Sequence, residues 1–234
     1  MINNQNNIDI YYLLNEMIKL IFGIKFLILY NILHADIKIN NILFNGKKLS
    51  LIDFGFVQNI NNFYNDNNFK WMITNYIYYY PPETQLFALL ANNEINKKKI
   101  KFNSLSLLKY LKEDIKNNKY IFNKYPNYFN EIKKINKFIK TQTESFYLKL
   151  KNKQIPNISD HYNELAKKID IYQLGIVIYL IIIYIFIFKS SEIEKIPIDI
   201  FKIIKKMIDP DPFTRIDIDS LITEYSKLFT KKKI

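Results

Sequence analysis

Four polar side chains of chemically useful types lie close together in the sequence. Asp36, Lys38 and Asn41 follow one another at spacings of two and three residues, and Asp53 comes shortly afterwards. Asn41 and Asp53 offer hard oxygen ligands of the kind that Mg²⁺ prefers, and Lys38 offers a positive charge. The first three residues could also form an ordinary polar turn. The presence of Asp53-Phe54-Gly55 at this distance favours a site over a turn.

The segment between these residues predicts a small β-hairpin. Two apolar runs, 42–44 and 49–52, are separated by Asn45-Gly46-Lys47-Lys48, and an Asn-Gly pair supplies the positive φ that a tight turn requires. The stretch His34-Ala35-Asp36-Ile37-Lys38-Ile39-Asn40-Asn41, with the hairpin and Asp53-Phe54-Gly55 after it, resembles the protein kinase signature H-R-D-x-K-x-x-N followed by D-F-G. Both spacings are met, and two motifs joined by a hairpin of the right length are far more specific than either alone.

The resemblance implies a role for each of the four side chains. Asp36 would be the catalytic base that accepts the proton of the substrate hydroxyl, and Lys38 would lie beside the transferring γ-phosphate. Asn41 and Asp53 would be the Mg²⁺ ligands, so that Lys38, Asn41 and Asp53 together would hold the metal-bound nucleotide. A lysine at position 38 points to serine/threonine specificity. The implied cofactors are ATP and Mg²⁺, and the implied substrate is a protein hydroxyl.

Three later landmarks extend the resemblance in the right order. Pro81-Pro82-Glu83 stands where kinases have A-P-E, Asp170 to Gly175 matches the start of their central buried helix, and Asp209 to Arg215 matches the loop that holds a late arginine. Arg215 is the only arginine beside 33 lysines, and it falls where a planar, bidentate partner for a carboxylate is wanted. We therefore expect a buried ion pair between Glu83 and Arg215.

The remaining polar residues of these motifs are expected to be structural. His34 is expected to be a packed, hydrogen-bonded core histidine, and Asp170 an anchor for the catalytic loop. His161 and the tyrosines at 78–80 are interpreted as packing or surface residues.

Hydrophobic periodicity predicts a mainly α fold with a small β-hairpin. The resemblance implies that this fold is a protein kinase-like C-terminal lobe without the N-terminal β-rich lobe. A long helix is predicted from Ile8 to Leu33, a loop over 57–70, and a buried helix over 169–188. Two amphipathic helices are predicted after it, one around 200–207 and one around 221–228 with Asp219 as its N-cap.

A Lys-rich stretch interrupts this lobe. Residues 84–165 carry +9 of the net charge of +12, and we interpret about 84–156 as a helical insertion with a charged exterior. Deleting residues 90–150 is expected to leave the lobe folded. Ile132, Ile135 and Ile139 keep helical spacing within it. The charge suits an acidic partner, whereas a nucleic-acid partner is not expected because the aromatic and basic residues form no recognisable binding module.

Composition bears on the location of the protein. The chain has no cysteine and no leader-like N-terminal pattern, so an intracellular, cytoplasmic protein is expected. The uncharged run Leu174 to Phe188 is 15 residues long, about 22 Å as a helix, which is short of the roughly 30 Å hydrocarbon core. We interpret it as a buried core helix and expect no transmembrane segment.

The sequence also departs from the kinase pattern. No Gly-x-Gly occurs, and only 33 residues precede the catalytic-loop motif, so the resemblance covers the C-terminal lobe alone and ATP affinity is expected to be poor. The chain is then either truncated or dependent on a separate N-lobe supplied in trans. The alternative is a non-catalytic, kinase-like scaffold that binds a partner through the basic insertion. Ala35 replaces the usual arginine, so the common phosphorylation switch is not expected.

Overall fold

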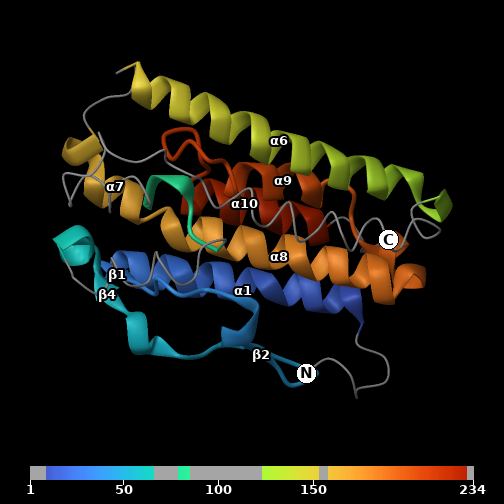
Figure 1. The fold of residues 1–234 in the computed structure, drawn as a ribbon. Coiled ribbons are helices and arrows are strands. Elements are labelled where there is room, and N and C mark those ends of the chain that lie inside the picture. Colours follow the sequence, from blue (N-terminus) through green and yellow to red (C-terminus); the bar gives the residue numbers. More distant parts are fainter. Residues whose placement is uncertain (1–8, 66–78, 85–122, 153–157, 231–234) are drawn as a thin grey trace.

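Helices dominate the part of the chain that the computed structural model describes, which is residues 9–65, 79–84, 123–152 and 158–230 (Figure 1). In chain order, with η for a 3₁₀ helix, the elements are α1 (Ile10–Leu29), β1 (Ile32–Leu33), η1 (Ile39–Asn41), β2 (Ile42–Phe44), β3 (Leu49–Leu51), η2 (Phe54–Phe56), β4 (Gln58–Asn59), η3 (Ile60–Asn65), α6 (Pro126–Lys151), η4 (Ile158–His161), α7 (Tyr162–Ala166), α8 (Ile169–Phe188), η5 (Ser190–Lys195), α9 (Ile200–Met207) and α10 (Ile218–Thr230). The prediction of a mainly α protein with a small β-hairpin is confirmed, and a second small antiparallel sheet, β1–β4, was not predicted.

Helix α8 is the centre of the core. Sixteen of its 20 residues are buried, which explains why the sequence is apolar on every side of the helix. Within the described residues, one helical stretch, Tyr162–Phe188, is long and apolar enough to cross a membrane, but 78% of its most apolar window is buried inside the protein. This burial is the environment of a core helix and does not show a transmembrane segment.

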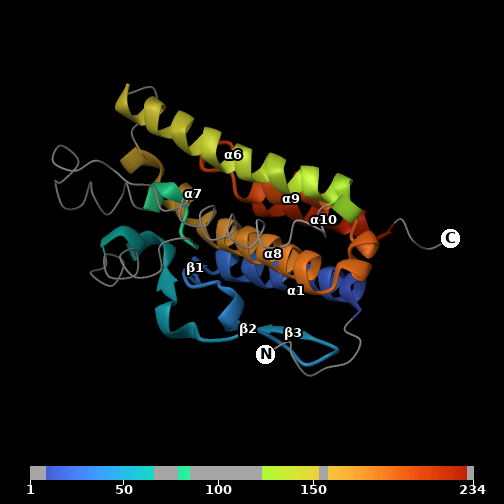
Figure 2. The same ribbon diagram turned by 45° about the vertical axis from the view of Figure 1, so that its right-hand side comes forward.

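Helix α1 packs along α8 and α10 (Figures 1 and 2). Asp9 is its N-cap, with Oδ1 accepting the backbone N–H groups of Tyr11 and Tyr12. The prediction that this helix runs to Leu33 is wrong, because it ends at Leu29 and Asn31 adopts a left-handed φ of 56°. Asparagine tolerates that conformation and so serves as a helix stop. The next two residues form β1 instead.

The two small sheets lie beside α1. Strands β2 and β3 form the predicted hairpin, with Ile42 opposite Leu51, and Gly46 has the positive φ of 89° that its turn requires. Strand β1 pairs with β4, placing Leu33 opposite Gln58. The prediction of a loop over 57–70 is therefore wrong for residues 58–65, which form β4 and η3. Residues 66–78 lie outside the described part.

Helix α6 packs on the opposite side of the helical layers from the β2–β3 hairpin (Figures 1 and 2). Its Ile132, Ile135 and Ile139 are buried in the main core, and the Tyr179 hydroxyl of α8 donates to Asn136 Oδ1 at 2.8 Å. The helical spacing predicted for these isoleucines is confirmed. Helix α6 therefore contributes to the core, and its buried isoleucines lie inside residues 90–150, whose deletion is predicted to leave the lobe folded. That prediction stays untested. Residues 85–122 lie outside the described part.

Helix α10 begins two residues earlier than its predicted N-cap implies. Asp217 Oδ1 accepts the backbone N–H groups of Asp219 and Ser220, at 3.0 and 2.9 Å, so Asp217 caps the helix. The prediction that Asp219 is the N-cap is wrong. Asp219 instead pairs with Lys25 of α1 at 2.6 Å, an exposed ion pair.

Two helical glycines occupy opposite environments, which gives a matched pair of stability predictions. A Cβ built on Gly175 of α8 would lie 2.7 Å from both Ile208 Cγ2 and Met207 Cβ, whereas a Cβ on Gly23 of α1 meets nothing within 4 Å. Gly175→Ala should therefore destabilise the protein by about 1–3 kcal/mol through overpacking. Gly23→Ala should stabilise it by about 0.5–1 kcal/mol because alanine is the better helix former. Urea unfolding measures both, and equal effects would contradict the packing of α8 against Met207 and Ile208.

Candidate active site

The catalytic-loop motif is held against the N-terminal end of α8. Asp170 accepts the backbone N–H groups of His34 and Ala35, at 2.8 and 2.9 Å. The carboxylate is fully buried, and its two oxygens satisfy two buried donors that the irregular backbone leaves without a ladder partner. The prediction that Asp170 anchors this loop is confirmed.

His34 is a core residue, as predicted. Its ring is buried, lies 4.9 Å from the ring of Phe54, and accepts the Asp36 N–H at Nδ1 over 3.3 Å. Burial lowers the pKa of His34, with the charges of Asp36 and Asp53 opposing the shift. The acceptor role of Nδ1 also requires the neutral ring, so geometry and desolvation favour the same state.

Three of the four predicted site residues form one cluster. Lys38 Nζ lies 2.8 Å from Asp36 Oδ2, and Asn41 Nδ2 donates to the same oxygen at 2.9 Å. Asn41 Nδ2 also donates to the Asp36 main-chain carbonyl at 2.9 Å. Asp36 and Asn41 are buried, whereas Lys38 is partly exposed. The cluster therefore holds one carboxylate between an ammonium and an amide at the edge of solvent.

Asp53, the fourth residue, follows the hairpin and lies at the same end of the loop. The preceding residue, Ile52, donates its N–H to the Asn41 carbonyl at 2.9 Å, and the following residue, Phe54, packs on His34. Asp53 has a left-handed φ of 62° and is exposed, with Oδ1 accepting the Gly55 N–H at 3.3 Å. A non-glycine residue in this conformation is uncommon and indicates a backbone held by its neighbours.

The donor set suits Mg²⁺ bound together with phosphate. Within the described ranges, no group of three or more His, Asp or Glu side chains gathers as a metal centre. Mg²⁺ commonly takes one or two protein oxygens and completes its shell with phosphates and water. The N–H₂ group of Asn41 donates its hydrogen bonds to Asp36, so the polar atom that remains for a ligand is the amide oxygen. That oxygen and the exposed carboxylate of Asp53 fit such a metal.

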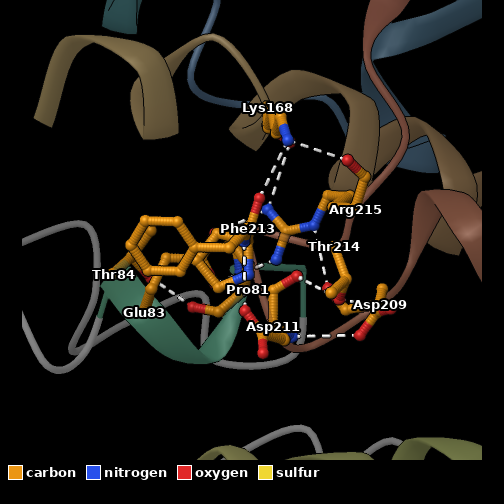
Figure 3. Close-up of polar contacts among 10 residues, drawn as sticks. Pro81, Glu83, Thr84, Lys168, Asp209, Asp211, Phe213, Thr214 and Arg215 are labelled. Carbon is orange, nitrogen blue, oxygen red and sulfur yellow. Dashed lines mark hydrogen bonds and ion pairs between the residues drawn. The ribbon is translucent and has the colours of Figure 1, made fainter. Parts of the chain in front are cut away.

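A second polar cluster ties distant segments together. Arg215 and Glu83 form a bidentate ion pair, with Nη1 to Oε1 at 2.5 Å and Nη2 to Oε2 at 2.9 Å, and neither side chain is exposed (Figure 3). Arg215 Nε also donates to the Asp209 carbonyl at 2.9 Å, and the guanidinium carbon lies 4.8 Å from the Tyr172 ring centre. The predicted pair of Glu83 with the single arginine is confirmed.

The loop around Arg215 is itself closed by hydrogen bonds. Lys168, just before α8, donates through Nζ to the carbonyls of Pro212 and Arg215, at 3.0 and 2.8 Å (Figure 3). Asp211 is joined to Lys149 of α6 at 2.8 Å. The ion pair therefore links residues 81–84 to the base of the helical body, and α6 joins the same region.

Comparison with known families agrees with this architecture. The model of the protein kinase domain matches residues 1–227 of the 234. The chain belongs to the protein kinase family. Neither the curated proteins nor the solved structures contain a match.

The kinase chain has two further buried residues at the catalytic loop that sequence reasoning missed as site residues. Gln173 of α8 and Tyr80 both donate to the Ala35 carbonyl, at 3.1 and 2.6 Å. Gln173 carried a signal, because a polar side chain in an apolar helix must find hydrogen-bond partners when buried. Tyr80 was interpreted only as a packing or surface residue.

The buried, neutral His34 predicts a pH dependence of folding. Because its pKa is lowered in the folded kinase, its contribution to stability is complete above the unfolded value near 6.5 and is lost as pH falls toward the folded value. The free energy of unfolding of wild type minus that of His34→Gln should fall by up to about 1.4 kcal/mol per pH unit over this window.

The free energy of unfolding is compared with that of His34→Gln because Asp170 gives it a pH dependence of the opposite sign. Burial raises the pKa of Asp170 to about 6, so its contribution is present below about pH 4 and is lost as pH rises through 6. The subtraction cancels the Asp170 contribution. A difference that stays constant from pH 7.5 to 5 would contradict a neutral, buried His34.

Proposed function

We propose that the chain transfers the γ-phosphate of Mg²⁺-bound ATP to serine or threonine hydroxyls of a protein. The observation that carries the proposal is the buried carboxylate of Asp36, held by Lys38 and Asn41, with the exposed Asp53 at the end of the hairpin that follows them. Phosphoryl transfer needs positioning and charge neutralisation more than covalent chemistry, and this set of groups supplies both.

Each side chain has a role that follows from its contacts. Asp36 receives the proton of the attacking hydroxyl, and its Oδ1 is the oxygen left over from the bonds that Lys38 and Asn41 make to Oδ2. Lys38 is partly exposed, so its ammonium can reach an incoming phosphate while staying near Asp36. Asn41 and Asp53 hold Mg²⁺, which neutralises phosphate charge when bound.

We propose that residues 1–234 supply only part of the nucleotide cleft. All four glycines lie outside any Gly-x-Gly pattern, so nothing in this sequence matches the glycine-rich loop that covers the phosphates in kinases. We propose that these residues form the C-terminal lobe and that the N-lobe is supplied from outside them, in trans. We also propose an intracellular, cytoplasmic location, on the basis of the cysteine-free composition.

Mg²⁺-ATP titration and a phosphotransfer assay test this proposal together. The chain is studied alone and with a candidate small lobe, with a mixture of serine-, threonine- and tyrosine-containing peptides as substrate. We expect a thermal shift that requires both Mg²⁺ and ATP, and label on serine or threonine. Label confined to tyrosine would contradict the specificity, and the absence of both shift and label in either mixture would contradict the activity.

A non-catalytic scaffold is the second candidate, and one surface favours it. Helix α6 exposes Lys133, Lys134, Lys137 and Lys140 toward solvent. A row of ammonium groups suits an acidic protein partner, with binding that weakens at higher salt. Replacing Lys137 and Lys140 by Gln should weaken such binding, and salt-independent binding would argue against this surface. The scaffold becomes the better account if this binding is found and phosphotransfer is not.

A further inference from the structure

The residue before Asp36 has a strained backbone. Ala35 is fully buried and has a left-handed φ of 65°, a conformation that residues with a side chain rarely adopt. Such a conformation persists only where the surroundings hold it in place. The contacts that hold Ala35 therefore also decide how the Asp36 carboxylate is directed.

The side chain of Gln173 binds the backbone on both sides of Asp36. Gln173 Nε2 donates to the Ala35 carbonyl at 3.1 Å, and Gln173 Oε1 accepts the Ile37 N–H at 3.0 Å. Gln173 is fully buried on α8, three residues after Asp170, so both side chains leave the same face of the helix. A single rigid amide thus fixes the peptide group on each side of Asp36.

A second side chain reaches the same carbonyl from another part of the chain. Tyr80 is buried, and its hydroxyl donates to the Ala35 oxygen at 2.6 Å. Tyr80 lies three residues before Glu83, whose ion pair with Arg215 fixes this segment. The backbone at Ala35 is therefore joined both to α8 and to the segment that the ion pair anchors.

We infer that Gln173 and Tyr80 are positioning residues that direct the Asp36 carboxylate by holding the peptide groups beside it. The catalytic part of this inference rests on the proposed function. Tyr80 acts through the Ala35 carbonyl, and Gln173 acts through the Ala35 carbonyl and the Ile37 N–H. Asp170 anchors the loop at the His34 and Ala35 N–H groups, and the two positioning residues hold the Ala35 carbonyl and the Ile37 N–H.

Tyr80→Phe and Gln173→Met test the inference, with Tyr225→Phe as the matched control. Tyr225 is also buried, and its hydroxyl donates to a main-chain carbonyl, that of Leu14, at 2.7 Å. Each Tyr→Phe change thus removes one buried hydroxyl, but only Tyr80 lies at the loop. Amide hydrogen exchange of residues 34–38 is followed by NMR in the full-length chain, with the amides of α8 as an internal reference.

Loss of either positioning contact should speed amide exchange in residues 34–38 about tenfold or more relative to α8, since a buried partner is left unpaired. Tyr225→Phe should leave that ratio as in wild type. Where phosphotransfer is measurable, kcat should fall roughly 10- to 100-fold, the usual effect of a small misplacement of a catalytic group, with little change in the KM for Mg²⁺-ATP.

Several results would overturn the inference. One is an exchange rate of residues 34–38 in Tyr80→Phe that equals the wild-type rate. Another is a rate that Tyr225→Phe raises as much as Tyr80→Phe does. A loss of turnover expressed only in KM would also overturn it. If Gln173→Met does not fold, Tyr80→Phe decides alone. If wild type transfers no phosphate under any condition, the proposed function fails, while the exchange ratio still decides whether these residues hold the loop.

Discussion

Replacing Asp36 by Asn should lower the rate of phosphotransfer about 10²- to 10⁴-fold, the usual contribution of a positioned general base. Asn is close in shape to Asp and keeps an oxygen that can accept from Lys38 and Asn41. The variant should therefore melt close to wild type, and the loss should appear in kcat. The rate is measured under the conditions that give the highest wild-type activity, with or without an added small lobe.

Asp217→Asn is the matched control for this experiment. Asp217 is also an aspartate with several hydrogen bonds, but it caps α10 away from the catalytic loop. The change should cost at most about 1 kcal/mol of stability and leave phosphotransfer unchanged. Activity of Asp36→Asn within a factor of about three of wild type would remove Asp36 from the role of base, because even a weak general base contributes more.

Breaking the Glu83–Arg215 pair should destabilise the protein by about 3–5 kcal/mol, because either single change leaves one buried group without its partner. Glu83→Ala leaves the guanidinium of Arg215 unpaired in the core. Arg215→Lys keeps a charge but loses the bidentate fork and the Nε bond to the Asp209 carbonyl. For a chain of this size the loss corresponds to a fall in Tm of roughly 6–20 °C.

Two further variants separate the buried pair from ordinary surface pairing. Lys25→Ala breaks the exposed pair with Asp219 and should change stability by no more than about 1 kcal/mol. The double variant Glu83→Leu with Arg215→Leu should be less destabilised than the sum of the two single changes, because no charge remains buried. An unchanged melt for Glu83→Ala or Arg215→Lys would contradict the structural role of the pair.

Elements with strong local signals could be predicted from the sequence. The hairpin carries an Asn-Gly turn between apolar runs, and α8 is apolar on all sides, so both are confirmed in place. The predicted C-terminal end of α1 and the predicted N-cap of α10 were wrong. Apolar residues continue past Leu29, but the left-handed Asn31 ends α1 and turns the chain into β1. Asp219 is the predicted N-cap of α10, but the hydrogen bonds show that Asp217 caps the helix.

Contacts between distant segments could be predicted only where the resemblance to kinases implied them. It implied the anchoring of the loop by Asp170 and the pairing of Glu83 with Arg215 across 132 residues, which the single arginine among the lysines also supported. No comparable signal exists for Tyr80 on the Ala35 carbonyl, because one tyrosine among 18 is not distinctive. The Lys-rich composition of 84–156 concealed that α6 supplies core isoleucines, since its charges mark only the outer face of that helix.

Broadening of amide NMR signals by Mn²⁺-ATP tests the central claim most directly, because it detects a shared metal-nucleotide site even when binding is weak. Mn²⁺ takes the same hard oxygen ligands as Mg²⁺. We predict that the signals of residues 38, 41 and 53 broaden first and together, that ATP is required, and that Asp53→Asn abolishes the effect. Broadening that begins elsewhere, or that Asp53→Asn leaves unchanged, would contradict a single site built from Asp36, Lys38, Asn41 and Asp53.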